Sequence, residues 1–294
     1  MGASIDEELP PALHCWRPMA HAAALRSLDA IEWVAVCSLT EARARSVQAR
    51  FSVARCYIDF ERMLVTERPE LLCIATPPEA HCAMIEIAAR AGVRAIYCEK
   101  PLVKNLAEAD RIVALCKEHD VSFNYGAQRR YMEPYRTLQR ALQSEKYGRL
   151  TSITIRCPPS PLYHIHSHSI DLLLFLIGGA PESVDARLFD PNAPDPVVLS
   201  ARLGFANGVE AHIAEGGGYQ VDLQTTELLL QVENNGAEVW LTRGARERLD
   251  FPPIRSGTAA GIEELVAALR GGSPTTGMVE GARLGMSVLQ AMRY

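Results

Sequence analysis

Residues 31 to about 130 alternate short apolar runs with segments of helical periodicity, and this alternation constrains the fold more than any other feature. Such alternation is typical of βαβ units and a parallel sheet. The expected strands are 31–37, 70–75, 95–98 and 121–125, and the expected helices are 40–50, 81–91 and 105–119. Thr40 and Asn105 are the expected N-caps of the first and last helix. We therefore expect a Rossmann-like α/β domain over residues 1–126.

The pattern changes after residue 150, where strand-like runs alternate with turn signals such as Asn207-Gly208 and Asn234-Asn235-Gly236. Asn-Gly between β-rich runs is a strong hairpin signal. The expected strands are 151–156, 183–189, 197–205, 209–213, 227–232 and 237–241, with helices near 167–177, 259–270 and 279–292. Residues 127–294 are thus expected to form an α+β domain with a largely antiparallel sheet, whose last helices can pack back on the first domain.

Charge and hydropathy limit the classes of partner. The chain has 35 acidic and 30 basic residues, a net charge of −5 and no Lys/Arg stripe, which argues against a nucleic-acid partner. The longest apolar stretch, near 170–179, is shorter than the roughly 20 residues a bilayer requires. The acidic N-terminus differs from a signal peptide, and the eight cysteines form no CxxC pair. We expect a cytoplasmic protein with a small-molecule substrate and no membrane partner.

Several polar residues come directly after predicted strands. In open α/β sheets, ligands bind beyond the carboxyl ends of the strands, so Thr76, Glu99 and Lys100 fall at the ligand edge. A lysine there can hold a hydroxyl or carbonyl of a substrate, and the glutamate can fix the lysine. On spacing alone, a solvated Glu-Lys pair before a proline turn is the more common explanation.

Motifs along nearly the whole chain strengthen the functional interpretation. They are the runs 34–37, 75–81, 98–102 (Cys-Glu-Lys-Pro-Leu), 106–110, 129–131 with Tyr135, and 263–270. On these motifs the chain resembles the glucose-fructose oxidoreductase/inositol dehydrogenase/MocA (Gfo/Idh/MocA) family. The resemblance implies an oxidoreductase that uses NAD or NADP and acts on a hydroxyl or carbonyl of a sugar, cyclitol or similar polar molecule. It also implies a homo-oligomer, whereas a hetero-oligomer with an active relative belongs to the alternative in which NAD(P) binding is lost.

The resemblance also assigns candidate residues. The lysine of the family's Glu-Lys-Pro assists proton transfer and binds substrate, which implies this role for Lys100. A later helix with Asp-x-x-x-His-x-x-Asp supplies catalytic groups, which implies His168 and Asp171, with His164 where the family usually has Asp. An imidazole there would not raise the pKa of His168 as a carboxylate would. The cofactor-binding candidates are Ser38, Thr76, Pro77, His81, Glu99 and Gln128, and the substrate-binding candidates are Tyr125, Arg129 and Tyr163.

The N-terminus departs from the family pattern, which opens with Gly-x-Gly-x-x-Gly. Alignment of His21 with the family's first helix places Leu13, Cys15 and Pro18 at the three glycine positions. Side chains at the first two positions obstruct the approach of a pyrophosphate to the backbone, and proline has no N–H to donate. The phosphate-binding loop is therefore expected to be degenerate.

The end of the second strand departs as well, because Cys37-Ser38 replaces the acid that usually holds the adenosine ribose. A serine there can accompany a preference for NADP, with Arg43 or Arg45 meeting the 2′-phosphate. Solvated helix residues are the favoured interpretation of both arginines.

These departures keep an alternative open. The fold can be retained without ordinary NAD(P) binding, giving a redox-independent acid–base enzyme or a non-catalytic partner subunit. A third hypothesis is a metal-dependent hydrolase or lyase at His164, His166 and His168. Their spacing lacks a recognised zinc framework, so no metal is expected.

Overall fold

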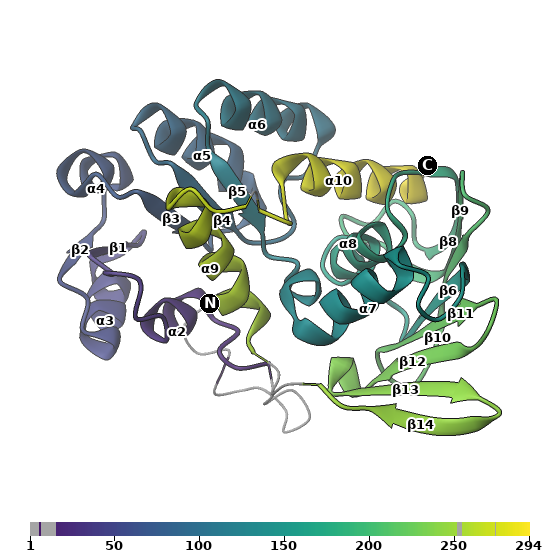
Figure 1. Cartoon of the computed structure of the whole chain (residues 1–294). Helices are drawn as coiled ribbons and strands as arrows, with labels where there is room; N and C mark the ends of the chain where they lie inside the picture. The colour runs from purple at the N-terminus through teal and green to yellow at the C-terminus, as the bar shows by residue number, and fades with distance from the viewer. Residues whose placement is uncertain (1–5, 7–15, 252–254, 274) are drawn as a thin grey trace. The chain divides into compact units, whose positions relative to one another are not determined.

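The computed structural model describes residue 6 and residues 16–251, 255–273 and 275–294 (Figure 1). Contacts between residues divide the chain into unit 1, Met1–Gln128 with Ser256–Arg283, and unit 2, Arg129–Arg255 with Leu284–Tyr294. Ser256–Arg283, which lies within the predicted second domain 127–294, therefore belongs to unit 1. The reason is that helix α9 (Gly257–Leu269) packs on the strands β4 (Ala95–Cys98) and β5 (Ser122–Tyr125).

Unit 1 is an α/β domain whose described strands pair only in parallel. Strands β1 and β2 form one sheet, and β3, β4 and β5 form a second in that order. Figure 1 shows helices on both faces of the second sheet, and β4 is buried along its whole length, as expected for a strand covered on both sides. The other elements, in chain order, are α2 (His21–Arg26), β1 (Ala35–Cys37), α3 (Glu41–Phe51), β2 (Arg55–Tyr57), α4 (Phe60–Glu67), β3 (Leu71–Ile74), α5 (His81–Arg90) and α6 (Leu106–Glu118).

Local capping explains where two of these helices begin. The Asn105 side chain accepts a hydrogen bond from the Glu108 N–H at 2.9 Å, which confirms the predicted cap of α6. Asp59 caps α4 in the same way. Thr40 occupies the N-cap position of α3, but its side chain makes no capping bond, so that prediction is wrong. Thr40 is exposed, and water can take the place of a side chain at an exposed helix end.

The described residues of unit 2 form a nine-stranded sheet, two complete α-helices and most of the last helix of the chain. The path of the sheet is β14-β13-β12-β11-β6-β10-β9-β7, with β8 paired to β9. All neighbours are antiparallel except β6 and β10, so the predicted largely antiparallel sheet is confirmed. The elements are α7 (Glu133–Gln143), β6 (Leu150–Cys157), β7 (Ser160–Pro161), α8 (His166–Ile177), β8 (Pro181–Phe189), β9 (Val197–Phe205), β10 (Glu210–Glu215), β11 (Gln220–Thr225), β12 (Leu229–Glu233), β13 (Glu238–Arg243) and β14 (Ala245–Leu249); α10 (Val279–Arg293) ends the chain.

The core of unit 2 lies between its sheet and the helices α7 and α8. Alternate residues of β6 and β9 are buried, among them Ile153, Ile155 and Leu203. Helix α8 contacts both α7 and β6, and it buries nearly all of its side chains. In the described part of the chain, no helix has the length and apolar content needed to cross a membrane.

Candidate functional site

The predicted ligand residues of unit 1 follow neighbouring parallel strands. Thr76 and Pro77 come after β3, Glu99 and Lys100 after β4, and Gln128 after β5. Backbone hydrogen bonds continue just past the strands, from Glu99 N to Ile74 O at 2.9 Å and from Gly126 N to Cys98 O at 2.7 Å. Because parallel strands end at the same edge, the structure brings these candidates to one edge of the sheet.

Glu99 has defined partners for both carboxylate oxygens. Its Oε1 lies 3.0 Å from Nε2 of His21 in α2, and its Oε2 accepts the backbone N–H of Lys100 at 3.0 Å. Burial alone would raise the pKa of Glu99, but the hydrogen bond and charge of His21, together with Lys100, hold that pKa below its usual value. Glu99 is therefore an anion that shapes the start of the Glu-Lys-Pro turn.

Lys100 is half-buried at the same edge, directly after Glu99. Its backbone is tied to Glu99, and its side chain carries an ammonium group that can hold a substrate oxygen by a charge-assisted hydrogen bond. The expected role of Glu99 in fixing this lysine agrees with that contact.

His81 has a different role from the predicted one. Its ring is fully buried, with Nδ1 2.8 Å from the carbonyl oxygen of Leu102 and Nε2 2.9 Å from that of Thr76. Both ring nitrogens are thus engaged by the protein. His81 links the segments that follow β3 and β4, so its effect on a cofactor is indirect, through the position of Thr76.

Tyr125 is the last residue of β5, and Gln128 lies just beyond it. Both are buried, and Oε1 of Gln128 has no hydrogen-bond partner among the described residues. A buried acceptor without a partner is unfavourable, and a carboxamide N–H such as that of nicotinamide would satisfy it. This end of the site fits the nicotinamide of a dinucleotide.

The residues expected near the adenosine lie in the other sheet of unit 1. Ser38, after β1, is half-buried and donates its backbone N–H to Tyr57 O at 3.1 Å. Arg45 is exposed and pairs with Glu41 at 2.6 Å, whereas Arg43 is exposed with no described partner. Both arginines are exposed residues of α3, in line with the favoured interpretation as solvated helix residues.

The loop before α2 presents two backbone N–H groups that already hold an anion. The N–H groups of Met19 and Ala20 donate to the two carboxylate oxygens of Asp6, at 2.6 and 3.1 Å. Pro18 offers no N–H, and Leu13 and Cys15, the other replacements of glycine, lie outside the described residues. A dinucleotide phosphate that used these N–H groups would have to displace Asp6.

In unit 2 the three alternating histidines do not share one environment. His164 is exposed, His166 is fully buried and His168 is half-buried. Helix α8 begins at His166, so His168 lies in its first turn and His164 precedes the helix. Asp195 instead fixes the segment before the helix, because its carboxylate accepts the backbone N–H groups of Tyr163 and His164 at 2.7 and 3.2 Å.

Asp171 is engaged by Arg130 rather than poised for proton transfer. Nε of Arg130 donates to Oδ2 at 2.8 Å and Nη2 donates to Oδ1 at 2.5 Å, and both side chains are almost fully buried. Burial raises the pKa of Asp171, while the guanidinium opposes that rise. The bidentate pair joins the 3-10 turn Gln128–Tyr131, which precedes α7, to α8, and it occupies both carboxylate oxygens. The predicted catalytic role of Asp171 is therefore replaced by an anchoring role.

Arg129 is also held inside unit 2. Its guanidinium carbon lies 3.7 Å from the ring centroid of Tyr219, and its Nη2 donates to Oδ1 of Asn235 at 3.0 Å. The Tyr219 hydroxyl in turn lies 3.3 Å from Oγ of Ser169 in α8. Sequence reasoning missed Tyr219 and Asp195, because nothing near them in the chain marks their contacts with α8 and the residues before it. The three glycines at 216–218, before Tyr219, are the one local signal.

Metal ligation has no support in the described part of the chain, where no three His, Cys, Asp or Glu side chains converge. Both ring nitrogens of His166 are buried without a partner among these residues, and burial lowers the pKa of His166 to about 4. An uncharged, buried imidazole on a mostly apolar helix behaves as a core residue.

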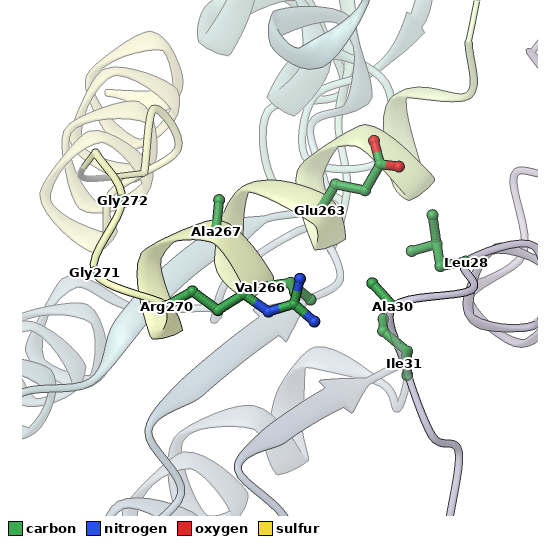
Figure 2. Close-up of a pocket in the computed structure, with 9 residues that line it drawn as sticks. All are labelled: Leu28, Ala30, Ile31, Glu263, Val266, Ala267, Arg270, Gly271 and Gly272. Carbon is green, nitrogen blue, oxygen red and sulfur yellow. The ribbon is translucent and has the colours of Figure 1, made fainter.

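A cavity of about 500 Å³ lies in unit 1, away from every predicted site residue. Figure 2 shows its wall formed by α9 and by the segment that follows α2. Glu263 and Arg270 supply its charged groups, and Leu28, Ile31 and Val266 supply apolar ones. The cavity therefore contributes nothing to the predicted site.

Comparison with known proteins assigns the first domain. Residues 16–127 match the model of the oxidoreductase family with an NAD-binding Rossmann fold, GFO_IDH_MocA. Residues 16–127 belong to the Gfo/Idh/MocA family. The resemblance inferred from the Glu-Lys-Pro and neighbouring motifs is confirmed.

Individual relatives extend this result. A D-apiose dehydrogenase of Paraburkholderia graminis is 34% identical over 128 residues, which cover 44% of this chain and 34% of the relative. A myo-inositol 2-dehydrogenase of Thermotoga maritima is 26% identical, over 56% of this chain and 53% of the relative. These matches thus span about a third and about half of the two relatives.

The fold of the whole chain also has a solved counterpart. An oxidoreductase from Agrobacterium radiobacter, solved in complex with NAD+, L-tartaric acid and magnesium, superposes with a TM-score of 0.81 at 18% identity. The superposition covers 94% of this chain and 92% of that one. The predicted pairing of a Rossmann-type domain with a mostly antiparallel α+β domain is confirmed.

Proposed function

We propose that this protein is an NAD(P)-dependent oxidoreductase that acts on a hydroxyl or carbonyl group of a sugar, cyclitol or related polar molecule. The carrying observation is Lys100 at the carboxyl edge of a Rossmann-type sheet, with its backbone tied to the Glu99 carboxylate. The relatives described above are named as dehydrogenases of a sugar and of a cyclitol, which supports this substrate class. Their names favour a redox reaction over the redox-independent and non-catalytic alternatives.

Each part of the edge has a task in this proposal. A bound nicotinamide dinucleotide supplies the acceptor or donor of the hydride. In the oxidation direction the neutral amine of Lys100 would accept the hydroxyl proton of the substrate and become an ammonium, and in the reduction direction the ammonium would return that proton to the carbonyl oxygen. Gln128 Oε1, which has no partner among the described residues, would accept the carboxamide N–H, and Thr76 borders the same edge. His168 lies in unit 2, half-buried near the start of α8, and for this residue the family motif by itself implies a substrate or proton-transfer role.

A substitution at Lys100 tests this function. We expect the purified protein to oxidise at least one of a panel of inositols, pentoses, hexoses and sugar acids with NAD+ or NADP+. Lys100→Met keeps the length of the side chain but removes its proton-carrying group, so kcat should fall by roughly 100-fold or more. Dinucleotide affinity should stay within about threefold, because Lys100 serves the substrate side.

The matched control is Lys117→Met, which changes an exposed lysine near the end of α6 and should leave turnover unchanged. Absence of turnover with every substrate and both dinucleotides contradicts the proposal. So does a Lys100→Met protein as active as the wild type.

A further inference from the structure

The buried pair of His21 and Glu99 connects the helix that follows the degenerate loop to the Glu-Lys-Pro turn. His21 is the first residue of α2, and its side chain is 8% exposed. Nε2 lies 3.0 Å from Glu99 Oε1, and the ring meets the Tyr97 ring edge-on, with centroids 4.9 Å apart. Tyr97 belongs to β4, so two contacts fix the imidazole against the strand that leads to Lys100.

Glu99 is held on its remaining sides as well. Its Oε2 accepts the N–H of Lys100, and its own N–H donates to Ile74 O at 2.9 Å. A Cβ on Gly126 would come within 3.1 Å of Glu99 Cα, Cδ and Oε2, so the carboxylate packs directly against the backbone after β5. Both carboxylate oxygens of Glu99 are therefore hydrogen-bonded, and among the described residues His21 supplies the side-chain partner.

We propose that His21 is a positioning residue that holds Lys100 in its working position through the Glu99 carboxylate. This inference rests on the proposed function of Lys100. The chain of contacts is short: imidazole Nε2 orients one carboxylate oxygen, the other oxygen captures the Lys100 N–H, and the lysine side chain extends from that fixed point.

The location of the pair favours positioning over simple stability. A hydrogen-bonded pair of largely buried polar side chains contributes little net stability compared with apolar side chains of similar size, because both groups lose hydration. This pair lies at the ligand edge of the sheet and acts on the residue beside it. The titratable groups that face Glu99 are His21 from α2, Lys100 after it and the Cys98 thiol before it. Removal of the His21 contact should therefore affect the position of Lys100 first.

A double-mutant cycle tests the proposal. His21→Phe removes the donor but keeps a ring, and kcat should fall by roughly 10- to 100-fold with little change in dinucleotide affinity. His21→Gln places an amide N–H near the position of Nε2 and should recover most of the loss. Glu99→Ala should cost about as much as His21→Phe, and the double variant no more than either, because both act through one contact. His212→Phe, which breaks a partly exposed His–Glu pair at 3.6 Å, is the control and should leave kcat unchanged.

Losses that multiply in the double variant overturn the proposal, as does an unchanged kcat in His21→Phe. A second measurement does not depend on turnover: hydrogen exchange of the Lys100 amide, followed by NMR, should be at least severalfold faster in His21→Phe and close to wild type in His21→Gln. If the wild-type protein shows no turnover, the proposed function fails by itself. The exchange rate of the Lys100 amide then tests the inference by itself, and equal rates in the wild type and His21→Phe overturn it.

Discussion

Two carboxylates of this chain show how partners, rather than residue type, determine the role of a charged group. Glu99 and Asp171 are both implied by family motifs, and both lie among buried atoms. Glu99 shares its oxygens between His21 and the Lys100 backbone, whereas Asp171 gives both oxygens to Arg130. The motif predicts that each acid is present. It does not predict Arg130 or His21 as partners, because these residues lie 41 and 78 positions away in the chain.

His166 gives a prediction about acid stability. The unfolded chain binds a proton at this residue near the usual pKa of 6.5, whereas the buried ring in the folded protein does so only near 4. The contribution of His166 to the free energy of unfolding is therefore fully retained above pH 6.5. It decreases by up to about 3 kcal/mol as the pH falls from 6.5 to 4. His166→Met should flatten the pH dependence of the urea midpoint in that window.

The control for this prediction is His119→Met, at the exposed end of α6, which should follow the wild-type curve. Parallel loss of stability in the wild type and His166→Met between pH 6.5 and 4 contradicts the account of His166.

At the level of elements, sequence periodicity predicts long segments well and short ones poorly. Helices α3, α5 and α6 and strands β3, β4 and β5 lie within a few residues of the predicted ranges. Strand β2 has three residues and one exposed arginine, so it has no periodicity to detect. Strand β14 is likewise missed, because it is polar and exposed and is recognised only through its pairing with β13.

The first residue of α9 carries a prediction at this level. A Cβ at Gly257 would lie 2.4 Å from the carbonyl oxygen of Gln128, so the backbone of one segment must move to accept alanine. We expect Gly257→Ala to destabilise the protein by roughly 1–3 kcal/mol, even though alanine is the better helix former. Urea unfolding measures the change.

Gly281 in α10 is the matched position, because no atom of the described residues outside its own stretch of helix lies within 4 Å of the point that a Cβ would occupy. Gly281→Ala should leave stability unchanged or raise it by up to about 1 kcal/mol. A Gly257→Ala protein as stable as Gly281→Ala contradicts the close approach of α9 to Gln128.

For the whole molecule, the order of strands and helices along the chain is enough to predict two domains and their fold classes. The exact division is harder, because Ser256–Arg283 returns to unit 1 after about 130 residues of unit 2. The polar contacts that attach this segment, such as the Asn124 side-chain NH₂ donating to Gly261 O at 2.7 Å, join residues 137 positions apart. The same holds for the candidate site. The sequence predicts which residues lie at the strand ends, but it does not predict the distant residues that contact them.

Dinucleotide binding is the most direct test of the central claim. Trp16 is buried two residues before Pro18, in the segment that leads into α2, so its fluorescence should report on a ligand in unit 1. The protein would be titrated with NADH and with NADPH while quenching of tryptophan and sensitised nicotinamide emission are recorded. The account predicts saturable binding of at least one of them in the micromolar range. No binding of either at millimolar concentration would contradict it.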